Sequence, residues 1–248
     1  MIWGFNDWPR PRYVAGGGDA LVFFEVCGQF SSEIELPLAE HHSSGPPEGV
    51  EVRLKDNDFS RWDGPMRELL RESNPDAART IESAPQVMEI RGEVRDPASL
   101  DYLRDVLGLV SALLDHGGIG VVEPQTLQLY PSTIWRETFW SGAFDAASHA
   151  AILLSMENDR VWMHTRGMRL FGRPDLSCRG AKPEEVEKLQ PVFNGLIRMQ
   201  AAGAIIPDGQ MVEAVGIENR LVCHRAGSLN DPEFNNFRLE LEWEGERT

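Results

Sequence analysis

The segment from Trp162 to Asp175 holds the residues of this chain whose types are best suited to act on a bound molecule. A planar guanidinium group can hold a carboxylate through two parallel hydrogen bonds, and an indole ring can form one wall of a pocket. A histidine can transfer a proton near neutral pH when a carboxylate orients its ring. In this interpretation His164 carries the proton and Asp175 orients it, and the candidate binding residues are Trp162, His164, Thr165, Arg166, Arg169 and Asp175.

The same segment also has a purely structural interpretation. Gly167 and Gly172 would permit unusual backbone angles in a tight turn, Phe171 would fill the core, and Pro174 would lead into the next strand. A histidine beside a tryptophan is more often a satisfied core residue than a base. The two interpretations differ in one respect, because only a functional site needs His164, Arg166 and Asp175 to converge on a pocket.

Other familiar sites are absent from the sequence. It contains no phosphate-binding loop, no nucleophile elbow and no zinc helix, and the glycine run 16–18 precedes an expected strand instead of opening a helix. The pairs His41-His42 and Cys223-His224 offer adjacent ligands, whose side chains point in opposite directions along an extended backbone. We therefore predict no metal site and no cofactor.

The charge of the chain limits its partners. Lys and Arg number 24 against 39 Asp and Glu, a formal net charge of −15. Such a surface repels phosphate backbones and anionic lipid, so we expect neither nucleic-acid nor membrane binding and favour a basic protein partner. The beginning of the sequence lacks the pattern of a signal peptide, and the three cysteines are far apart in the chain. Both features predict a cytoplasmic protein with reduced thiols.

The first part of the chain predicts strands on either side of helical segments. Strands are expected at Ala20–Gly28 and Gln86–Arg91, and a long exposed loop at 31–49. Helical stretches fill 61–84, where Pro75 starts the second helix. A longer helix with Asp96 as its N-cap carries an apolar stripe and ends at Gly117-Gly118. Two short strands follow at Ile119–Val122 and Thr126–Tyr130.

The second part begins with a hairpin whose register the turn determines. A two-residue turn at Asn158-Asp159 pairs Met156 with Val161 and Leu153 with His164. Trp162, His164 and Arg166 then share one face of the strand, while Val161, Met163 and Thr165 share the other. A helix is expected from Pro183, with Pro191 either kinking it or marking its true beginning, and Gly203 ending it. Three last strands are expected at Met211–Val215, Arg220–Arg225 and Phe237–Trp243.

One pattern in the chain resembles a known family. Thr165-x-Gly167-Met168 followed by Phe171-Gly172-x-Pro174-Asp175 is similar to the motif of a bacterial family catalogued as a domain of unknown function. The likeness extends over about residues 98–243, where a long helix closing on glycine and Gly-Ile-Gly-Val-Val-Glu-Pro-Gln precede a tryptophan-bearing segment. It implies a bacterial cytoplasmic protein and, because the family carries no established activity, no reaction.

These patterns together predict an α+β fold, with mixed or antiparallel sheets each covered by a helix and a resemblance between two halves. The N-terminal half spans 1–140 and the C-terminal half 141–248, with their boundary between Pro131 and Ser148; the two halves can also pack as one domain. The leading functional hypothesis is a non-enzymatic binding or accessory protein with a basic protein partner. The alternative is an enzyme or sensor for an anionic small molecule, using His164, Arg166 and Asp175.

Overall fold

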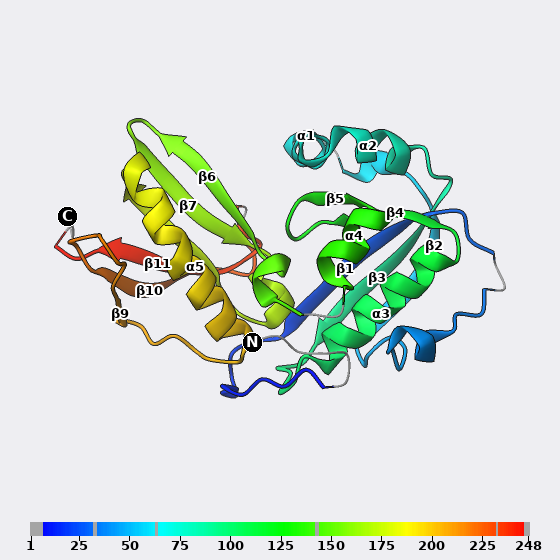
Figure 1. Ribbon diagram of the computed structural model, residues 1–248, viewed down its shortest axis with the longest axis horizontal. Coiled ribbons are helices and arrows are strands. Elements are labelled where there is room, and N and C mark those ends of the chain that lie inside the picture. Colours follow the sequence, from blue (N-terminus) through cyan, green and yellow to red (C-terminus); the bar gives the residue numbers. More distant parts are fainter. Residues whose placement is uncertain (1–6, 32–33, 63, 142–143, 232, 246–248) are drawn as a thin grey trace. The chain divides into compact units, whose positions relative to one another are not determined.

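The computed structural model describes residues 7–31, 34–62, 64–141, 144–231 and 233–245 (Figure 1). The chain forms two compact units, each of which combines residues that are distant in sequence. The first unit comprises Met1–Pro9 and Leu21–Asp145, and the second comprises Arg10–Ala20 and Ala146–Thr248. Each unit contains one mostly antiparallel sheet with helices packed against it, so the predicted α+β class is confirmed.

The first unit contains a five-stranded sheet in the order β2-β3-β1-β4-β5. Its strands are β1 (Ala20–Gly28), β2 (Val50–Asp56), β3 (Gln86–Val94), β4 (Gly118–Glu123) and β5 (Gln128–Pro131). Its α-helices are α1 (Gly64–Ser73), α2 (Pro75–Glu82), α3 (Asp101–Asp115) and α4 (Ser132–Phe139). Pro75 opens α2, as predicted, with Asn74 as the N-cap whose side chain accepts a hydrogen bond from the Ala77 amide.

Helices pack against both faces of this first sheet. Leu70 of α1 and Ile81 of α2 join Cys27 and Val122 in one buried apolar cluster. Residues that alternate with these along the strands, such as Val26, point to the face that carries α3. Most side chains of α3 are buried, which explains why its apolar stripe was easy to recognise in the sequence.

Three predictions for the first unit were wrong in detail. The long helix begins at Asp101 instead of near Asp96, because the preceding residues pair with the start of the chain: the Leu100 amide donates to the Trp8 carbonyl at 2.7 Å. The strand expected from Thr126 begins at Gln128, since the Thr126 hydroxyl bonds back to Glu123 and forms a turn. Residues 32–33 of the expected loop 31–49 lie outside the described residues, and the rest is only partly exposed, because Ser43 is buried and its hydroxyl donates to the Asp105 carbonyl at 2.7 Å.

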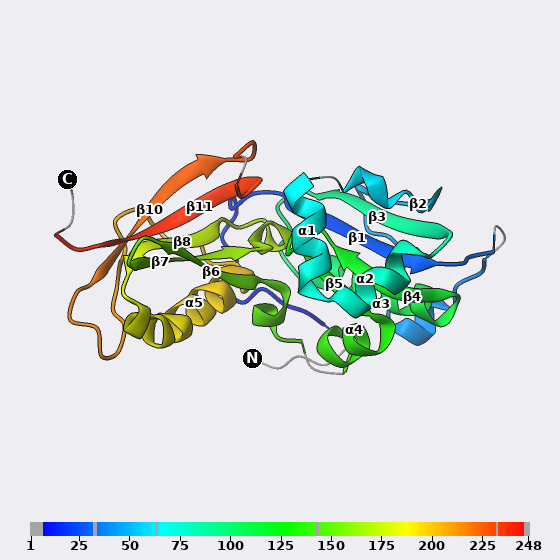
Figure 2. The ribbon, with the colours of Figure 1, turned by 90° about the horizontal axis from the view of Figure 1, so that it is seen from above.

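The second unit contains a six-stranded sheet in the order β6-β7-β8-β11-β10-β9, with β8 and β11 parallel and the other neighbours antiparallel. Its long helix is α5 (Val186–Ala201), which lies along one face of the sheet (Figure 2). The short helices η4 (Met168–Phe171) and η5 (Pro183–Glu185) follow β7 and precede α5. The strands are β6 (Ala151–Glu157), β7 (Arg160–Arg166), β8 (Asp175–Ala181), β9 (Met211–Val212), β10 (Leu221–Ser228) and β11 (Asn236–Trp243).

The hairpin of the second unit has the predicted register, with Leu153 opposite His164 and Met156 opposite Val161. The predicted helix begins at Pro183 as η5, which leads directly into α5 at Val186. Since α5 continues through Pro191, this proline does not mark the beginning of the helix. One prediction of a strand needs correction. The strand β9 ends at Val212 instead of Val215.

The segment 10–20, which the sequence analysis placed in the N-terminal half, is part of the second unit. The Arg10 side chain is buried, and its guanidinium group donates to the carbonyls of Phe171 at 2.9 Å, Ala201 at 3.0 Å and Gln200 at 3.1 Å. One arginine therefore connects the beginning of the chain to the end of α5. Among the helices of the described residues, none has the length and apolar character that crossing a membrane requires.

Candidate functional site

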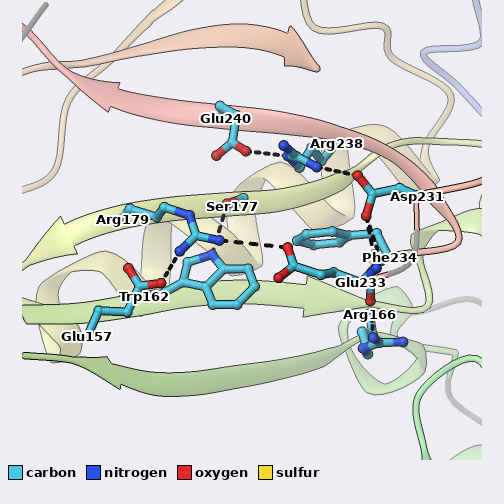
Figure 3. A network of polar contacts seen from close by, with 10 residues as sticks. All are labelled: Glu157, Trp162, Arg166, Ser177, Arg179, Asp231, Glu233, Phe234, Arg238 and Glu240. Carbon is cyan, nitrogen blue, oxygen red and sulfur yellow. Dashed lines mark hydrogen bonds and ion pairs between the residues drawn. The ribbon is translucent and has the colours of Figure 1, made fainter. Parts of the chain in front are cut away.

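The strand β7 divides its side chains between two environments, as its alternation predicts. Val161, Met163 and Thr165 are buried, while Trp162 and Arg166 keep partial exposure on the opposite side. The α5 side of the sheet is the apolar one. The candidate site is consequently the other face of the second sheet, where polar and aromatic side chains from β7, β8 and β11 meet (Figure 3).

His164 is sealed between aromatic rings on this face. Its side chain is 7% exposed, and its ring stacks on Trp162 with the centroids 4.1 Å apart and meets Phe234 edge-on at 5.6 Å. Burial, together with the positive charges of Arg166 and Arg179, lowers the pKa of His164 to about 4. The ring is therefore neutral at pH 7, and its Nδ1 atom finds no hydrogen-bond partner among the described residues.

The Asp175 carboxylate accepts hydrogen bonds from groups other than His164, which the sequence predicts as its partner. Its buried carboxylate accepts hydrogen bonds from the Thr165 hydroxyl at 2.9 Å, the Met168 amide at 3.2 Å and the Asn236 side-chain amide at 2.8 Å. Burial raises its pKa to about 6 although these bonds act in the opposite direction. These bonds join β7, η4, β8 and β11, and the hydrogen bonds described for Asp175 do not include His164. The structure brings Thr165 and Asp175 together, but not the pair that a general base would need.

The arginines of the turn bind backbone carbonyls of their own chain. Arg166 donates to the Glu233 carbonyl, and burial lowers its pKa from the usual value. Arg169 donates to the Asn235 carbonyl at 3.0 Å. Arg173, which is 2% exposed, donates to the carbonyls of Gly172, Gly203 and Ala204 at 2.8, 2.8 and 3.1 Å. All three guanidinium groups thus hold the turns around them, a role that the sequence did not predict.

Two other arginines, which the sequence interpretation did not single out, stand on the strands of this face. The guanidinium carbon of Arg179 lies 3.8 Å from the centroid of the Trp162 ring. The guanidinium nitrogens form ion pairs with the carboxylates of Glu157 and Glu233. The Trp162 indole donates to the Ser177 hydroxyl at 3.0 Å. Arg238 pairs with Asp231 on one side and Glu240 on the other. Figure 3 shows the two arginines above neighbouring strands.

An open groove of about 520 Å³ lies beside this network. The sequence signal for it is the alternation in β11, where Arg238, Glu240 and Glu242 share one side and Leu239 and Leu241 the other. We call this surface the arginine–glutamate face and define it by Glu157, Trp162, Arg179, Arg238, Glu240 and Glu242. The groove is lined by Arg179, Gly180, Ala226, Arg238, Glu240, Leu241, Glu242 and Trp243.

Carboxylates outnumber guanidinium groups on this surface. Among the described residues, the arginine–glutamate face has three carboxylates and two guanidinium groups, and the adjoining Arg166, Asp231 and Glu233 raise these numbers to five and three. The carboxylates are those of Glu157, Asp231, Glu233, Glu240 and Glu242. The surface is therefore a preordered array with a local excess of negative charge.

The described residues contain no group of three or more His, Cys, Asp or Glu side chains that could hold a metal ion. His41 instead contacts Ser111 and Asp115, and Cys223 is buried in β10. Comparison with protein-family models, curated proteins and solved structures finds no match for this chain. The resemblance of Thr165–Asp175 to a bacterial family accordingly stays a prediction.

Proposed function

We propose that this protein is a non-enzymatic binding protein whose arginine–glutamate face contacts a basic protein partner. The observation that carries the proposal is the excess of carboxylates on a half-exposed, internally paired surface (Figure 3). A cationic side chain of the partner can join these pairs without exposing a buried charge. The proposal includes a bacterial, cytoplasmic setting, as the sequence predicts.

The composition of the face supports a role in protein recognition. Tryptophan and arginine are enriched among the residues that dominate binding energies at protein interfaces. Here the Arg179 group already rests on the Trp162 ring, and Arg238 is held between two carboxylates. Because these side chains are ordered before a partner arrives, binding costs less conformational entropy.

The distribution of charge supports a basic partner. The sequence of the first unit has 10 Lys and Arg against 23 Asp and Glu, a net charge of −13, whereas the second has 14 against 16, a net charge of −2. The first unit therefore provides the long-range attraction for a cationic molecule, which acts mainly on the rate of encounter. The second unit provides the contact surface.

The enzymatic alternative receives less support from the geometry. It needs His164, Arg166 and Asp175 around one ligand, but His164 is enclosed by Trp162 and Phe234 and the Asp175 oxygens are occupied by internal donors. A base with a pKa near 4 also accepts protons poorly at neutral pH.

Site-specific photo-cross-linking in the native host tests the proposal. A photoreactive residue replaces Glu242, which is exposed on the arginine–glutamate face, and in a control variant it replaces Glu187, which is exposed on α5 across the sheet. We expect a basic protein to be captured at position 242 and not at 187, with a yield that falls as salt increases. Equal capture at both positions, or capture of acidic proteins alone, would contradict it.

A further inference from the structure

The strand β6 lies at the edge of the second sheet. It pairs with β7 on one side, and no described strand lies on its other side. An edge strand offers a row of unpaired amides and carbonyls, which natural proteins usually protect with lysine, proline or a bulge. The β6 sequence Ala-Ile-Leu-Leu-Ser-Met-Glu has no lysine or proline, and its seven residues pair with β7 without a register shift. Among the described strands of the second unit, none pairs with this edge, which can therefore accept another strand.

A row of apolar side chains runs along the same strand, and two of the three are exposed. Leu153 is opposite His164, so Ile152, Leu154 and Met156 point to the other side of the sheet, where α5 lies. Leu154 is 55% exposed and Met156 is 64% exposed, whereas Met163 on the adjacent strand is fully buried. The helix therefore covers β7 and leaves the apolar row of β6 uncovered.

We propose that a second copy of this chain occupies the β6 edge, through antiparallel pairing of the two β6 strands about a two-fold axis at Leu154. In this register Leu154 faces its own counterpart, Met156 faces Ile152 of the second copy, and Glu157 faces Ala151. No like charges stand opposite each other, and the two apolar rows lie on one side, between the two α5 helices. Such pairing extends the sheet across both copies.

The charge distribution favours a second copy at this edge. Two chains of net charge −15 repel each other, but the second unit carries a net charge of only −2. The edge therefore belongs to the part of the molecule where two copies repel each other least. Apart from Glu157 at the end of β6, the arginine–glutamate face is formed by β7, β8 and β11. Pairing along the backbone edge of β6 therefore leaves this face accessible and presents it twice, which would strengthen binding to a repetitive partner.

The mass of the full chain in solution tests this inference. We expect light scattering to give twice the chain mass of 27.8 kDa at micromolar concentrations. Leu154→Lys places like charges opposite each other at the axis and should weaken dimerisation by roughly tenfold or more. Met211→Lys is the matched control, because Met211 is 50% exposed in β9 at the opposite edge of the same sheet. Circular dichroism confirms that both variants are folded.

Cysteine cross-linking provides a second readout that does not depend on the strength of association. The native cysteines are buried, so Leu154→Cys adds one accessible thiol at the axis, where opposite strand residues approach closely enough for a disulfide. We expect oxidation to link two chains through position 154 and to leave Met211→Cys as single chains. A monomer at every concentration, a dimer insensitive to Leu154→Lys, or equal linking by the two cysteine variants would overturn the inference. If the natural occupant of this edge were a different protein, the purified chain would be a monomer, and the inference would be wrong.

Discussion

The two units of the molecule differ in their net charge and in the number of their basic residues. The first carries nearly all of the net charge, −13, while the second carries −2 with a larger number of basic residues. In the second unit the guanidinium groups of Arg10, Arg166 and Arg173 bind backbone carbonyls, and those of Arg179 and Arg238 bind carboxylates. In the proposed function, long-range attraction and specific contact therefore belong to separate parts of one chain.

The largest expected effect tests the internal role of the arginines in the second unit. Arg173→Met should lower the free energy of unfolding by about 3 kcal/mol or more, because it removes the donors of several buried carbonyls. Arg53→Met in the first unit is the control, since that side chain is exposed. Urea denaturation measures both. Equal effects of the two substitutions would remove the contrast between the units.

A second prediction concerns the buried carboxyl group of the first unit. Burial raises the pKa of Glu123 to about 7 from an ordinary value of 4.5, against the hydrogen bond from Thr126. Its stabilising contribution is therefore complete below pH 4.5 and is lost as the pH rises through 7. Glu123→Gln should abolish this loss, which amounts to roughly 3 kcal/mol. Unfolding of the two proteins from pH 4.5 to 8 measures the difference, and parallel profiles would show that Glu123 does not titrate in this range.

The second unit should respond to pH in the opposite direction through His164. Its folded pKa of about 4 lies below the ordinary 6.5, so its contribution to stability is complete above pH 6.5 and is lost as the pH falls through 4. His164→Phe keeps a ring between Trp162 and Phe234 and should remove a loss of roughly 2 kcal/mol. Asp175, whose pKa is raised to about 6, titrates in the same window with the opposite sign, so the comparison is between variant and parent at each pH. An unchanged difference from pH 4 to 7 would contradict the assignment.

The smallest expected effect on stability is at Arg179. Its ion pairs are nearly half exposed, so Arg179→Ala should change the free energy of unfolding by less than about 1 kcal/mol. The same substitution should clearly lower the yield of cross-linking at position 242, because Trp162, Glu157 and Glu233 lose the guanidinium group that orders them before a partner binds. Denaturation and cross-linking are measured on the same preparation. A large loss of stability with normal cross-linking would make Arg179 a structural residue only.

The sequence predicted those features that depend on residues close together in the chain. The hairpin register followed from a two-residue turn and strict alternation, and both are local. The apolar stripe of α3 was recognised for the same reason. The first residue of the helix was not predicted correctly, because the Leu100 amide donates its hydrogen bond to the distant Trp8 carbonyl. Local patterns are reliable until a remote segment competes for the same backbone groups.

The candidate site depended on such remote partners and was predicted only in part. Trp162, His164 and Arg166 share a side of β7, as expected, but the partner of Asp175 is Asn236, which follows it by 61 positions. The pairing of β7 with β8 also shifts register between Val161 and Met163, and no sequence period reveals this irregularity. Arg179 meets Glu157 of β6 only once β7 pairs with both β6 and β8. Arg238, by contrast, pairs with Glu240 two positions along its own strand, and this pair was open to prediction from the alternation of β11.

The path of the chain affects the order in which the molecule can form. Residues 10–20 belong to the second unit, although the residues before and after them belong to the first. The second unit therefore needs a segment that is synthesised long before the rest of it. The guanidinium group of Arg10 must wait for Phe171, Gln200 and Ala201 to emerge from the ribosome before it can close that unit. A fragment that starts at Ala146 would lack the hydrogen bonds of Arg10, so we expect the second unit to fold completely only when residues 10–20 are present.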